Sequence, residues 1–324
     1  MGGDLGSKVV VQGAVEAHKK YSIPVVLVGD ESEIKKHLSD LSYEDKIDII
    51  HAPQVITMKD SPARAMRTKP EASIIKAFKA VKEGKASGVV SPGNTGAVMA
   101  SGLFISSTLP GIDRPAIASL IPRGNSSTPT VLLDSGANTD CHSEQLVQFA
   151  VMGDFYSRLA IGLENPSVGL LSNGTEKSKG TDLIRATSSK LSKLNNFNYI
   201  GFVEGRDIVN GNVDIVVCDG FLGNVVLKTI EGGVRLVLGM FFAKPTLKKV
   251  FHKKLNPSEY GGAPLLGLND VAIICHGSSN SMAIKNAIKV ANKLYNEDLI
   301  KKLNSALLIL DNGTSESEDN NLEK

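Results

Sequence analysis

Val-Val-Ser-Pro-Gly-Asn-Thr-Gly, residues 89–96, is an apolar run that ends in a turn of small polar residues. Three other segments repeat this pattern: Leu-Leu-Asp-Ser-Gly-Ala-Asn (132–138), Val-Val-Cys-Asp-Gly-Phe-Leu-Gly-Asn (216–224) and Ile-Ile-Cys-His-Gly-Ser-Ser (273–279). Each run is typical of a buried parallel strand, and glycine-rich turns before helices bind anions. Because open α/β folds bind ligands at the carboxyl edge of the sheet, the four turns predict one crevice that handles phosphate or an oxyanion.

The composition is that of an ordinary globular protein, with 42% hydrophobic and 22% charged residues in a chain of 324. A formal net charge of +2 and the absence of tryptophan give no basic or stacking surface, so we expect no nucleic-acid partner. Cys141, Cys218 and Cys275 lack disulfide or metal-site spacing and indicate a reducing compartment. No apolar leader follows a basic start, so we expect a cytoplasmic protein, and we expect no metal or cofactor.

Strand and helix patterns alternate along most of the chain. Apolar runs at 25–30 and 168–171 predict strands, and the spacing at 73–83 predicts a helix. The alternation predicts a three-layer α/β/α sandwich, in which helices cover both faces of a mostly parallel sheet. We expect a single catalytic domain over 1–311 and a polar, disordered tail over 312–324.

The segment 229–258 breaks this alternation, because it contains two amphipathic stretches and no strand pattern. The second stretch has apolar residues on one face and lysines on the other. We therefore expect a helical hairpin that protrudes from the sheet, with Phe241 and Phe242 at its tip and Lys248 and Lys249 close by.

Longer motifs are specific to one protein family. They are Met-Gly-Gly-Asp (1–4), Gly-Asn-Thr-Gly-Ala (93–97), Pro-Gly-Ile-Asp-Arg-Pro-Ala (110–116), Glu-Gly-Arg-Asp-Ile (204–208), Cys-Asp-Gly-Phe (218–221), Glu-Tyr-Gly-Gly-Ala-Pro-Leu-Leu-Gly (259–267) and Cys-His-Gly-Ser-Ser (275–279). Over residues 1–295 the chain resembles the phosphate acyltransferases of bacterial phospholipid synthesis, which transfer a fatty acyl group from acyl carrier protein to inorganic phosphate.

The resemblance implies a fold like that of phosphotransacetylases and isocitrate dehydrogenases. It also implies a homodimer and a cytoplasmic enzyme that associates peripherally with a membrane. The implied partners are acyl carrier protein, inorganic phosphate, an anionic membrane surface and a membrane glycerol-3-phosphate acyltransferase.

The implied reaction needs few special groups, because hydrogen phosphate is already a nucleophile near neutral pH. The site must hold phosphate beside a thioester and stabilise the oxyanion, for which backbone N–H groups of the glycine turns are suitable donors. We predict catalytic roles for Asn94, Arg206 and His276, and His276 could protonate the leaving thiolate. Substrate or phosphate contacts are predicted for Gly93, Thr95, Gly96, Arg114, Gly136, Asn138, Lys177, Lys179, Asp219, Asn224, Gly277, Ser278 and Ser279.

Each candidate also has a structural interpretation. His276 ends a strand and is compatible with packing, Arg206 is compatible with a salt-bridged loop, and the glycines are compatible with tight turns. Cys141 stands next to His142, but adjacent residues rarely form a catalytic dyad. Nothing in the sequence lowers the pKa of the Cys141 thiol, so we expect no covalent acyl-enzyme.

Several alternatives stay open. The hairpin is compatible with a solvated surface helix, a dimer contact, an anionic membrane surface or the docking of the acidic carrier protein. A short-chain phosphotransacetylase that uses coenzyme A is the nearest rival function. A dinucleotide-dependent dehydrogenase is disfavoured because no Gly-x-Gly-x-x-Gly follows the first strand. A membrane scaffold without enzymatic activity would explain the hairpin but not the crevice.

The chain opens on the turn 1–4, where a doubly wound fold usually has a strand first. The resembling family has a short strand before this turn. We therefore expect that the natural product starts upstream, or that this form is less stable and less active because its sheet lacks a strand.

Overall fold

A computed structural model describes residues 2–44, 46–124, 126, 128–194, 197–240, 261–305 and 307. The first half of the chain forms α1 (Gly6–Tyr21), β1 (Val26–Gly29), α2 (Glu31–Asp40), β2 (Asp48–His51), α3 (Pro62–Thr68), α4 (Ser73–Lys82), β3 (Gly88–Ser91), α5 (Thr95–Ser101), the π-helical turn η1 (Gly102–Ser106), β4 (Ala116–Ile117), β5 (Ser119–Ile121), β6 (Thr130–Leu133) and α6 (Ser143–Tyr156).

The second half continues the alternation of strands and helices. It forms the π-helical turn η2 (Ser157–Ile161), β7 (Val168–Leu171), α7 (Asp182–Leu191), β8 (Tyr199–Val203), α8 (Gly205–Asn210), β9 (Ile215–Val217), α9 (Gly220–Met240), β10 (Ala263–Leu266), β11 (Val271–Ile274) and α12 (Ser281–Asn296). The strands and helices predicted from periodicity are present within a few residues of their expected bounds.

The strands form three hydrogen-bonded groups, in the orders β1-β2, β3-β11-β10-β4 and β5-β6-β9-β7-β8. Among the described residues, five of the eight strand pairings are parallel and three are antiparallel. All three antiparallel pairings involve the short strands β4, β5 and β10, which the periodicity did not predict. The sheet is therefore mixed where the chain crosses from one group of strands to the next.

Helices cover both faces of the strands, which confirms the predicted three-layer α/β/α architecture. α1, α6, α7 and α12 bury one large apolar cluster, and α4 and α5 bury a second cluster elsewhere against the strands. Strands β6, β7 and β11 are buried along their whole length, as expected of short apolar runs. Within the described ranges, no helix combines the length and apolarity needed to cross a bilayer.

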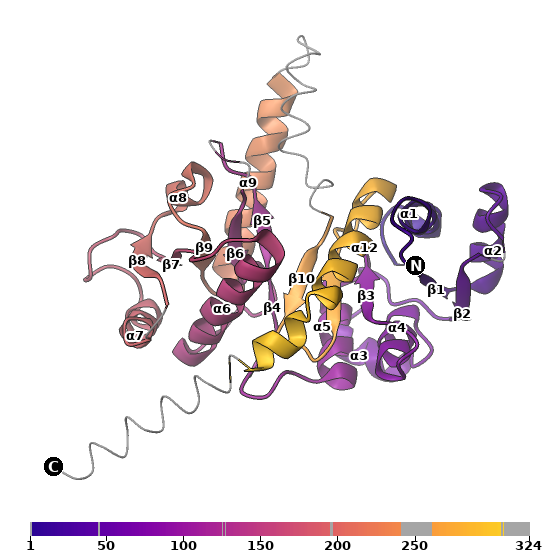
Figure 1. Ribbon diagram of the computed structural model, residues 1–324, viewed down its shortest axis with the longest axis horizontal. Helices are drawn as coiled ribbons and strands as arrows, with labels where there is room; N and C mark the ends of the chain where they lie inside the picture. The colour runs from indigo at the N-terminus through magenta and orange to yellow at the C-terminus, as the bar shows by residue number, and fades with distance from the viewer. Residues whose placement is uncertain are drawn as a thin grey trace.

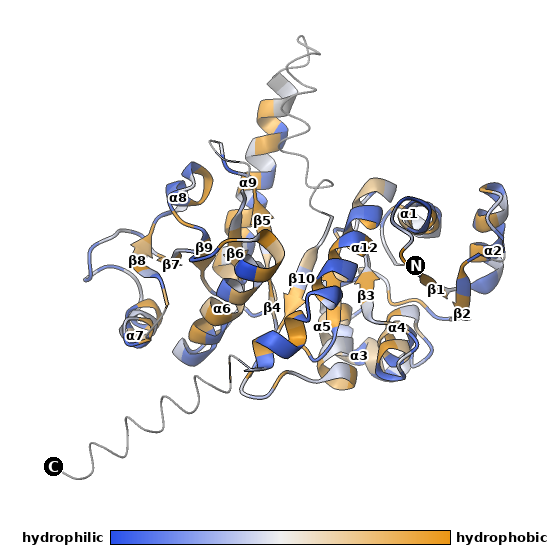
Figure 2. Cartoon of the chain, in the orientation of Figure 1, coloured by the Kyte–Doolittle hydropathy of each residue, from blue (hydrophilic) through white to orange (hydrophobic). Residues whose placement is uncertain are grey.

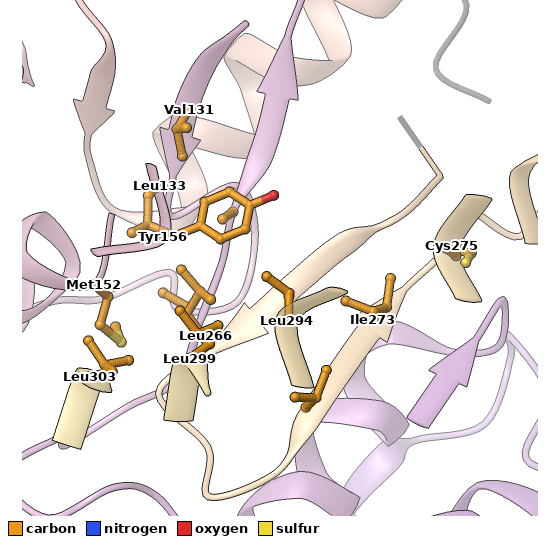
Figure 3. Packing of buried hydrophobic residues seen from close by; sticks show 14 of the residues in the cluster. Val131, Leu133, Met152, Tyr156, Leu266, Ile273, Cys275, Leu294, Leu299 and Leu303 are labelled. Carbon is orange, nitrogen blue, oxygen red and sulfur yellow. The ribbon is translucent and has the colours of Figure 1, made fainter. Parts of the chain in front are cut away.

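One core connects the strand groups. Figure 3 shows Val131 and Leu133 of β6 gathered in the same cluster as Leu266 of β10, Ile273 of β11 and Leu294 of α12. All five side chains are less than 4% exposed. Because residues from two strand groups share this cluster, the carboxyl ends of their strands are held in a fixed relation, and these ends carry the predicted turns.

A cavity of about 510 Å³ separates β1 from β3. Its walls include Leu27 of β1 and Val89 of β3, with Val11, Ile74 and Ile284 from the helices on either face. Within the described chain, β1 pairs only with β2, and β3 pairs only with β11, so one edge of each strand is unpaired. The cavity thus lies where a further strand could bond to both edges.

Helix α9 extends outward beyond the strands that carry it (Figure 1). Its first half packs with Leu222, Val226 and Ile230 against the cluster beneath β6 and β9. Farther along, Leu236 is 63% exposed, and Figure 2 shows apolar segments along the helix. The predicted hairpin begins within α9, but Phe241, Phe242, Lys248 and Lys249 lie outside the described residues, as does the predicted tail over 312–324.

Candidate active site

The first edge of the candidate crevice lies at the carboxyl ends of the parallel strands β3 and β11. The Cys275 backbone N–H donates to the Ser91 carbonyl oxygen at 2.8 Å and continues the pairing toward the turns. The Asp4 backbone N–H donates to the Gly277 carbonyl oxygen at 2.8 Å. The segment that opens the chain therefore forms part of this edge.

Asn94 is the N-cap of α5, and its amide is engaged on both sides. Its Oδ1 accepts from the Ala97 backbone N–H at 3.0 Å, while its Nδ2 donates to the carbonyl oxygens of Thr57 at 3.1 Å and Asp60 at 3.2 Å. The loop that it holds is fastened in turn by Lys69, which donates to Asp60 and lowers the pKa of that carboxyl to about 2. The side chain predicted to be catalytic thus positions this turn.

Gly93, Thr95 and Gly96 complete the turn after β3. Thr95 and Gly96 are the first two residues of α5, whose N–H groups have no acceptor within a helix. A Cβ at Gly96 would lie 2.5 Å from Pro62 Cγ, so the glycine is required by packing. The Gly93 N–H donates to Ser91 Oγ at 3.2 Å, so the backbone donors of the predicted kind in this turn are those of Thr95 and Gly96.

His276 follows β11, and its side chain is exposed. The Ser278 backbone N–H donates to His276 Nδ1 at 3.2 Å, and Ser278 Oγ lies 2.7 Å from the same nitrogen. The Ser279 backbone N–H donates to the His276 carbonyl oxygen at 2.9 Å. At Gly277, a Cβ would lie 2.6 Å from a carboxylate oxygen of Asp4. These contacts hold the imidazole in place. The N–H groups of Ser278 and Ser279 were predicted to donate to the ligand, but both donate to His276.

The second edge is organised by a buried carboxylate that sequence reasoning missed. Asp134 Oδ1 accepts from the backbone N–H groups of Ile117 at 3.0 Å and Gly136 at 3.1 Å. Its Oδ2 accepts from the N–H groups of Ala137 at 3.0 Å and Asn138 at 2.7 Å. Burial raises the pKa of Asp134, although these donors oppose that effect.

These hydrogen bonds correct one expectation. The N–H groups of Gly136, Ala137 and Asn138 were predicted to donate to the ligand, but all three donate to Asp134. The Asn138 amide is also engaged, because Nδ2 donates to Asp134 and to the Pro115 carbonyl oxygen at 2.9 Å each. This turn binds the protein's own carboxylate. The signal available in the sequence was an aspartate directly after a buried apolar run.

The start of α9 is built onto the same turn. The Gly220 backbone N–H donates to the Asn138 carbonyl oxygen at 2.6 Å. Asp219 Oδ1 accepts from the Leu222 backbone N–H at 2.8 Å and so caps the helix. The predicted site residue Asp219 therefore has a clear structural role at the helix N-terminus.

Helix α9 contacts both the turn after β6 and the turn after β11. Asn224 packs against the turn at Gly136, and its Nδ2 lies 3.0 Å from where a Cβ on that glycine would be. One turn later, Lys228 Nζ lies 3.4 Å from His276 Nε2 and donates to Glu231 at 2.8 Å. Residues four apart share a helix face, so the predicted site residue Asn224 was a signal that Lys228 lies on the same face of α9. The sequence prediction did not include that lysine.

Other predicted site residues lie farther along the sheet. Arg206 follows the edge strand β8 and pairs with Glu204. Lys177 and Lys179 follow β7 and are exposed. Arg114 precedes β4 and is exposed, and its guanidinium has no hydrogen bond or ion pair within the described residues. The structure does not bring these four side chains into contact with His276.

The cysteine thiols are not activated. Burial, aided by the carboxylates of Asp134 and Asp219, raises the pKa of Cys141 to about 11. Burial raises the pKa of Cys275 to about 12 and also raises that of Cys218. A thiol with a raised pKa is a poor nucleophile near neutral pH. The site therefore offers backbone donors, His276 and Lys228 rather than a thiolate.

Comparison with known proteins places the chain in a family. A family model described as "Fatty acid synthesis protein" matches residues 1–302. A phosphate acyltransferase of Geotalea uraniireducens is 48% identical over 324 residues, which cover 94% of this chain and 92% of that protein. One of Pelotomaculum thermopropionicum is 45% identical over 322 residues, or 95% of this chain and 93% of that protein. The chain belongs to the phosphate acyltransferase family. The resemblance seen in the sequence motifs is confirmed.

Solved structures agree with the fold of this phosphate acyltransferase family member. A phosphotransacetylase from Streptococcus pyogenes aligns with a TM-score of 0.65 at 22% identity, over 90% of this chain and 92% of that chain. The EutD phosphotransacetylase from Staphylococcus aureus aligns with a TM-score of 0.61 at 16% identity, over 89% and 91%. These likenesses show a shared fold.

Proposed function

We propose that this chain transfers a fatty acyl group from the thioester of acyl carrier protein to inorganic phosphate, which gives an acyl phosphate for phospholipid synthesis. The observation that carries the proposal is identity of 45% and 48% to phosphate acyltransferases over more than nine tenths of both chains. The relatives' name supports acyl transfer to phosphate as the class of reaction. The turns after β3 and β11 and helix α9 provide backbone N–H donors, an imidazole and an ammonium group, which suit that reaction.

The chemistry follows from the groups at the two edges. A phosphate oxygen forms a bond to the thioester carbonyl carbon, the C–S bond breaks, and the thiolate leaves with a proton. His276, held by Ser278, is the proposed source of that proton or a hydrogen-bond donor to phosphate. The first-turn N–H groups of Thr95 and Gly96 are the proposed oxyanion donors.

We propose direct attack by phosphate, without a covalent acyl-enzyme. Of the three thiols, Cys141 is the least buried, and its raised pKa leaves almost no thiolate near neutral pH. A phosphate nucleophile needs no activation by a neighbouring base. Position and electrostatic stabilisation thus provide the acceleration.

The exposed apolar side chains of α9 support two of the implied contacts, a second copy of the chain and a lipid surface. We propose a cytoplasmic homodimer that touches an anionic membrane, receives its acyl group from the carrier protein and hands its product to a membrane acyltransferase. The exposed side chains of Phe221 (65%) and Leu236 (63%) give α9 an apolar surface that a dimer or a lipid surface would cover. Sedimentation would report the dimer, and replacing Phe241 and Phe242 by aspartate should abolish binding to anionic vesicles but spare turnover of soluble substrates.

A short-chain phosphotransacetylase is the second candidate, because the related folds in Streptococcus pyogenes and Staphylococcus aureus carry that name. Mass spectrometry distinguishes the two functions. Purified protein is mixed with phosphate and either a long-chain acyl carrier protein or acetyl coenzyme A. We expect acyl phosphate from the carrier protein alone. Acetyl phosphate as the dominant product would favour the second candidate, and no product from either donor would contradict both.

A further inference from the structure

The side chains of Lys228 on α9 and His276 after β11 meet at the point where the helix passes this turn. A backbone N–H always donates, so the bond from Ser278 N–H to His276 Nδ1 at 3.2 Å makes Nδ1 an acceptor. A neutral ring that accepts at Nδ1 carries its proton on Nε2, and Ser278 Oγ, 2.7 Å from Nδ1, then donates to the same nitrogen. Nε2 lies 3.4 Å from Lys228 Nζ, which is a group with donors and no acceptor.

Lys228 is held in this position by its own helix. Its Nζ donates to Glu231 Oε2 at 2.8 Å, and the same carboxylate oxygen lies 3.6 Å from Arg235. The carboxylate of Glu231 occupies one of the three ammonium hydrogens, which leaves two for other acceptors. The Lys228 side chain is half exposed, so a small anion can reach it.

The two donors lack an acceptor between them. Within the described residues, the carboxylates near this point are Glu231, which already binds Lys228, and Asp4, which lies against Gly277. An oxygen of an anion placed to one side of this pair, within hydrogen-bond distance of both Nζ and Nε2, would accept from both groups and would offset their unfavourable approach. A dianion gains more from the ammonium than a neutral carbonyl oxygen does.

We propose that Lys228 and His276 together bind inorganic phosphate, with one phosphate oxygen accepting from Lys228 Nζ and His276 Nε2. This inference rests on the proposed function, because it names the residues that seat its acceptor substrate. Asn224 on the same face of α9 packs on the Gly136 turn, so the position of Lys228 depends on both edges of the crevice. Bound phosphate would then connect α9, which packs on the turn after β6, with His276 in the turn after β11.

The same chemistry could serve the phosphodiester of the carrier protein's prosthetic arm, so the test must separate the two sources. In the Lys228→Met variant we expect the KM for inorganic phosphate to rise about 10-fold to 100-fold, the range of one charge-assisted hydrogen bond. The KM for acyl carrier protein should stay within about 2-fold. Lys228→Arg should recover part of the loss, because it keeps the charge.

Matched controls keep the result specific. Lys35 on α2 also pairs with a glutamate one turn away, Glu31, so Lys35→Met removes an equivalent helical lysine away from the crevice. It should leave both KM values unchanged. His276→Gln places an amide donor near the position of Nε2 and should bind phosphate better than His276→Leu does. Circular dichroism and thermal melting establish that every variant is folded.

Calorimetry with inorganic phosphate alone makes the inference testable without turnover. We expect wild-type protein and Lys35→Met to bind phosphate, and Lys228→Met to bind at least 10-fold more weakly. Equal binding and an equal KM for phosphate in a folded Lys228→Met protein would overturn the inference while the proposed function stands. A rise only in the KM for acyl carrier protein would assign the site to the phosphodiester and would also overturn it. Weakened phosphate binding together with a wild type that forms no acyl phosphate would support the anion site and contradict the proposed function.

Discussion

Gly223 of α9 packs so closely on Asp134 that a Cβ at this position would lie 1.9 Å from the Asp134 carbonyl oxygen. No side chain can be accommodated there without moving the helix or the turn. Because the Asp134 carboxylate also holds the turn after β6, this contact ties the entry of α9 to the second edge of the crevice. The same helix then carries Lys228 to His276 at the first edge.

Replacing Gly223 by alanine should therefore displace α9. We expect the free energy of unfolding to fall by about 1–3 kcal/mol, as for overpacked cores, and turnover to fall with it. The matched control is Gly232→Ala on the same helix, where no atom lies within 4 Å of the added Cβ. That change should raise helix stability by about 0.5–1 kcal/mol. Chemical denaturation and steady-state kinetics measure both effects, and equal behaviour of the two variants would contradict the packing argument.

Asp134→Asn should disturb the turn that carries Gly136 and Asn138. Each carboxylate oxygen accepts at least two N–H groups, so an amide nitrogen in either place would face donors. We expect a loss of about 1–3 kcal/mol in stability and a strong loss of kcat. Asp154→Asn is the control, because Asp154 of α6 is also a buried carboxylate but pairs with Arg158 of η2. It should change the unfolding midpoint and leave kcat near wild type. Unchanged kcat in a folded Asp134→Asn protein would show that the turn does not shape the site.

Cys141→Ser should retain most activity. The pKa of the Cys141 thiol is raised to about 11, so the thiolate is absent over the physiological pH range and the rate should show no dependence on thiol ionisation there. Turnover of acyl carrier protein is compared for wild type and variant between pH 6 and about 9, with mass spectrometry of the intact protein. A loss greater than about 100-fold together with a trapped acyl thioester on wild-type protein would establish a covalent route instead.

The cavity between β1 and β3 should accept a strand. An apolar extended segment of about six residues, added ahead of Met1, would pair with the free edges of both strands and fill about 510 Å³. We expect a higher melting temperature and turnover at least as high, because buried backbone groups gain partners and the Gly2–Asp4 turn is better held. The control extension carries a central proline, which cannot donate to the ladder. If both extensions leave the melting temperature unchanged, the cavity is not a strand position.

The repeated pattern of apolar run and glycine turn was sufficient to predict the layered architecture and the turns after β3 and β11. Apolar runs of four residues are too short for helices, so runs that alternate with helical patterns are predicted as strands. Asn94 and Asn280 cap the helices that follow two of these strands. The antiparallel strands β4, β5 and β10 were not predictable, because they are short and their partners are distant in sequence.

Sequence by itself determined the fold class, the family and the positions of the glycine-rich turns, since these depend on local residue patterns. Tertiary structure alone decided how those turns are used. The N–H groups of Ala137 and Asn138, which the sequence predicts as donors to phosphate, donate to Asp134. The strand order places β8, and Arg206 after it, at the edge of the sheet. Only the packing of α9 across two edges brings Lys228 to His276, because these residues are 48 positions apart and meet through contacts that no local pattern records.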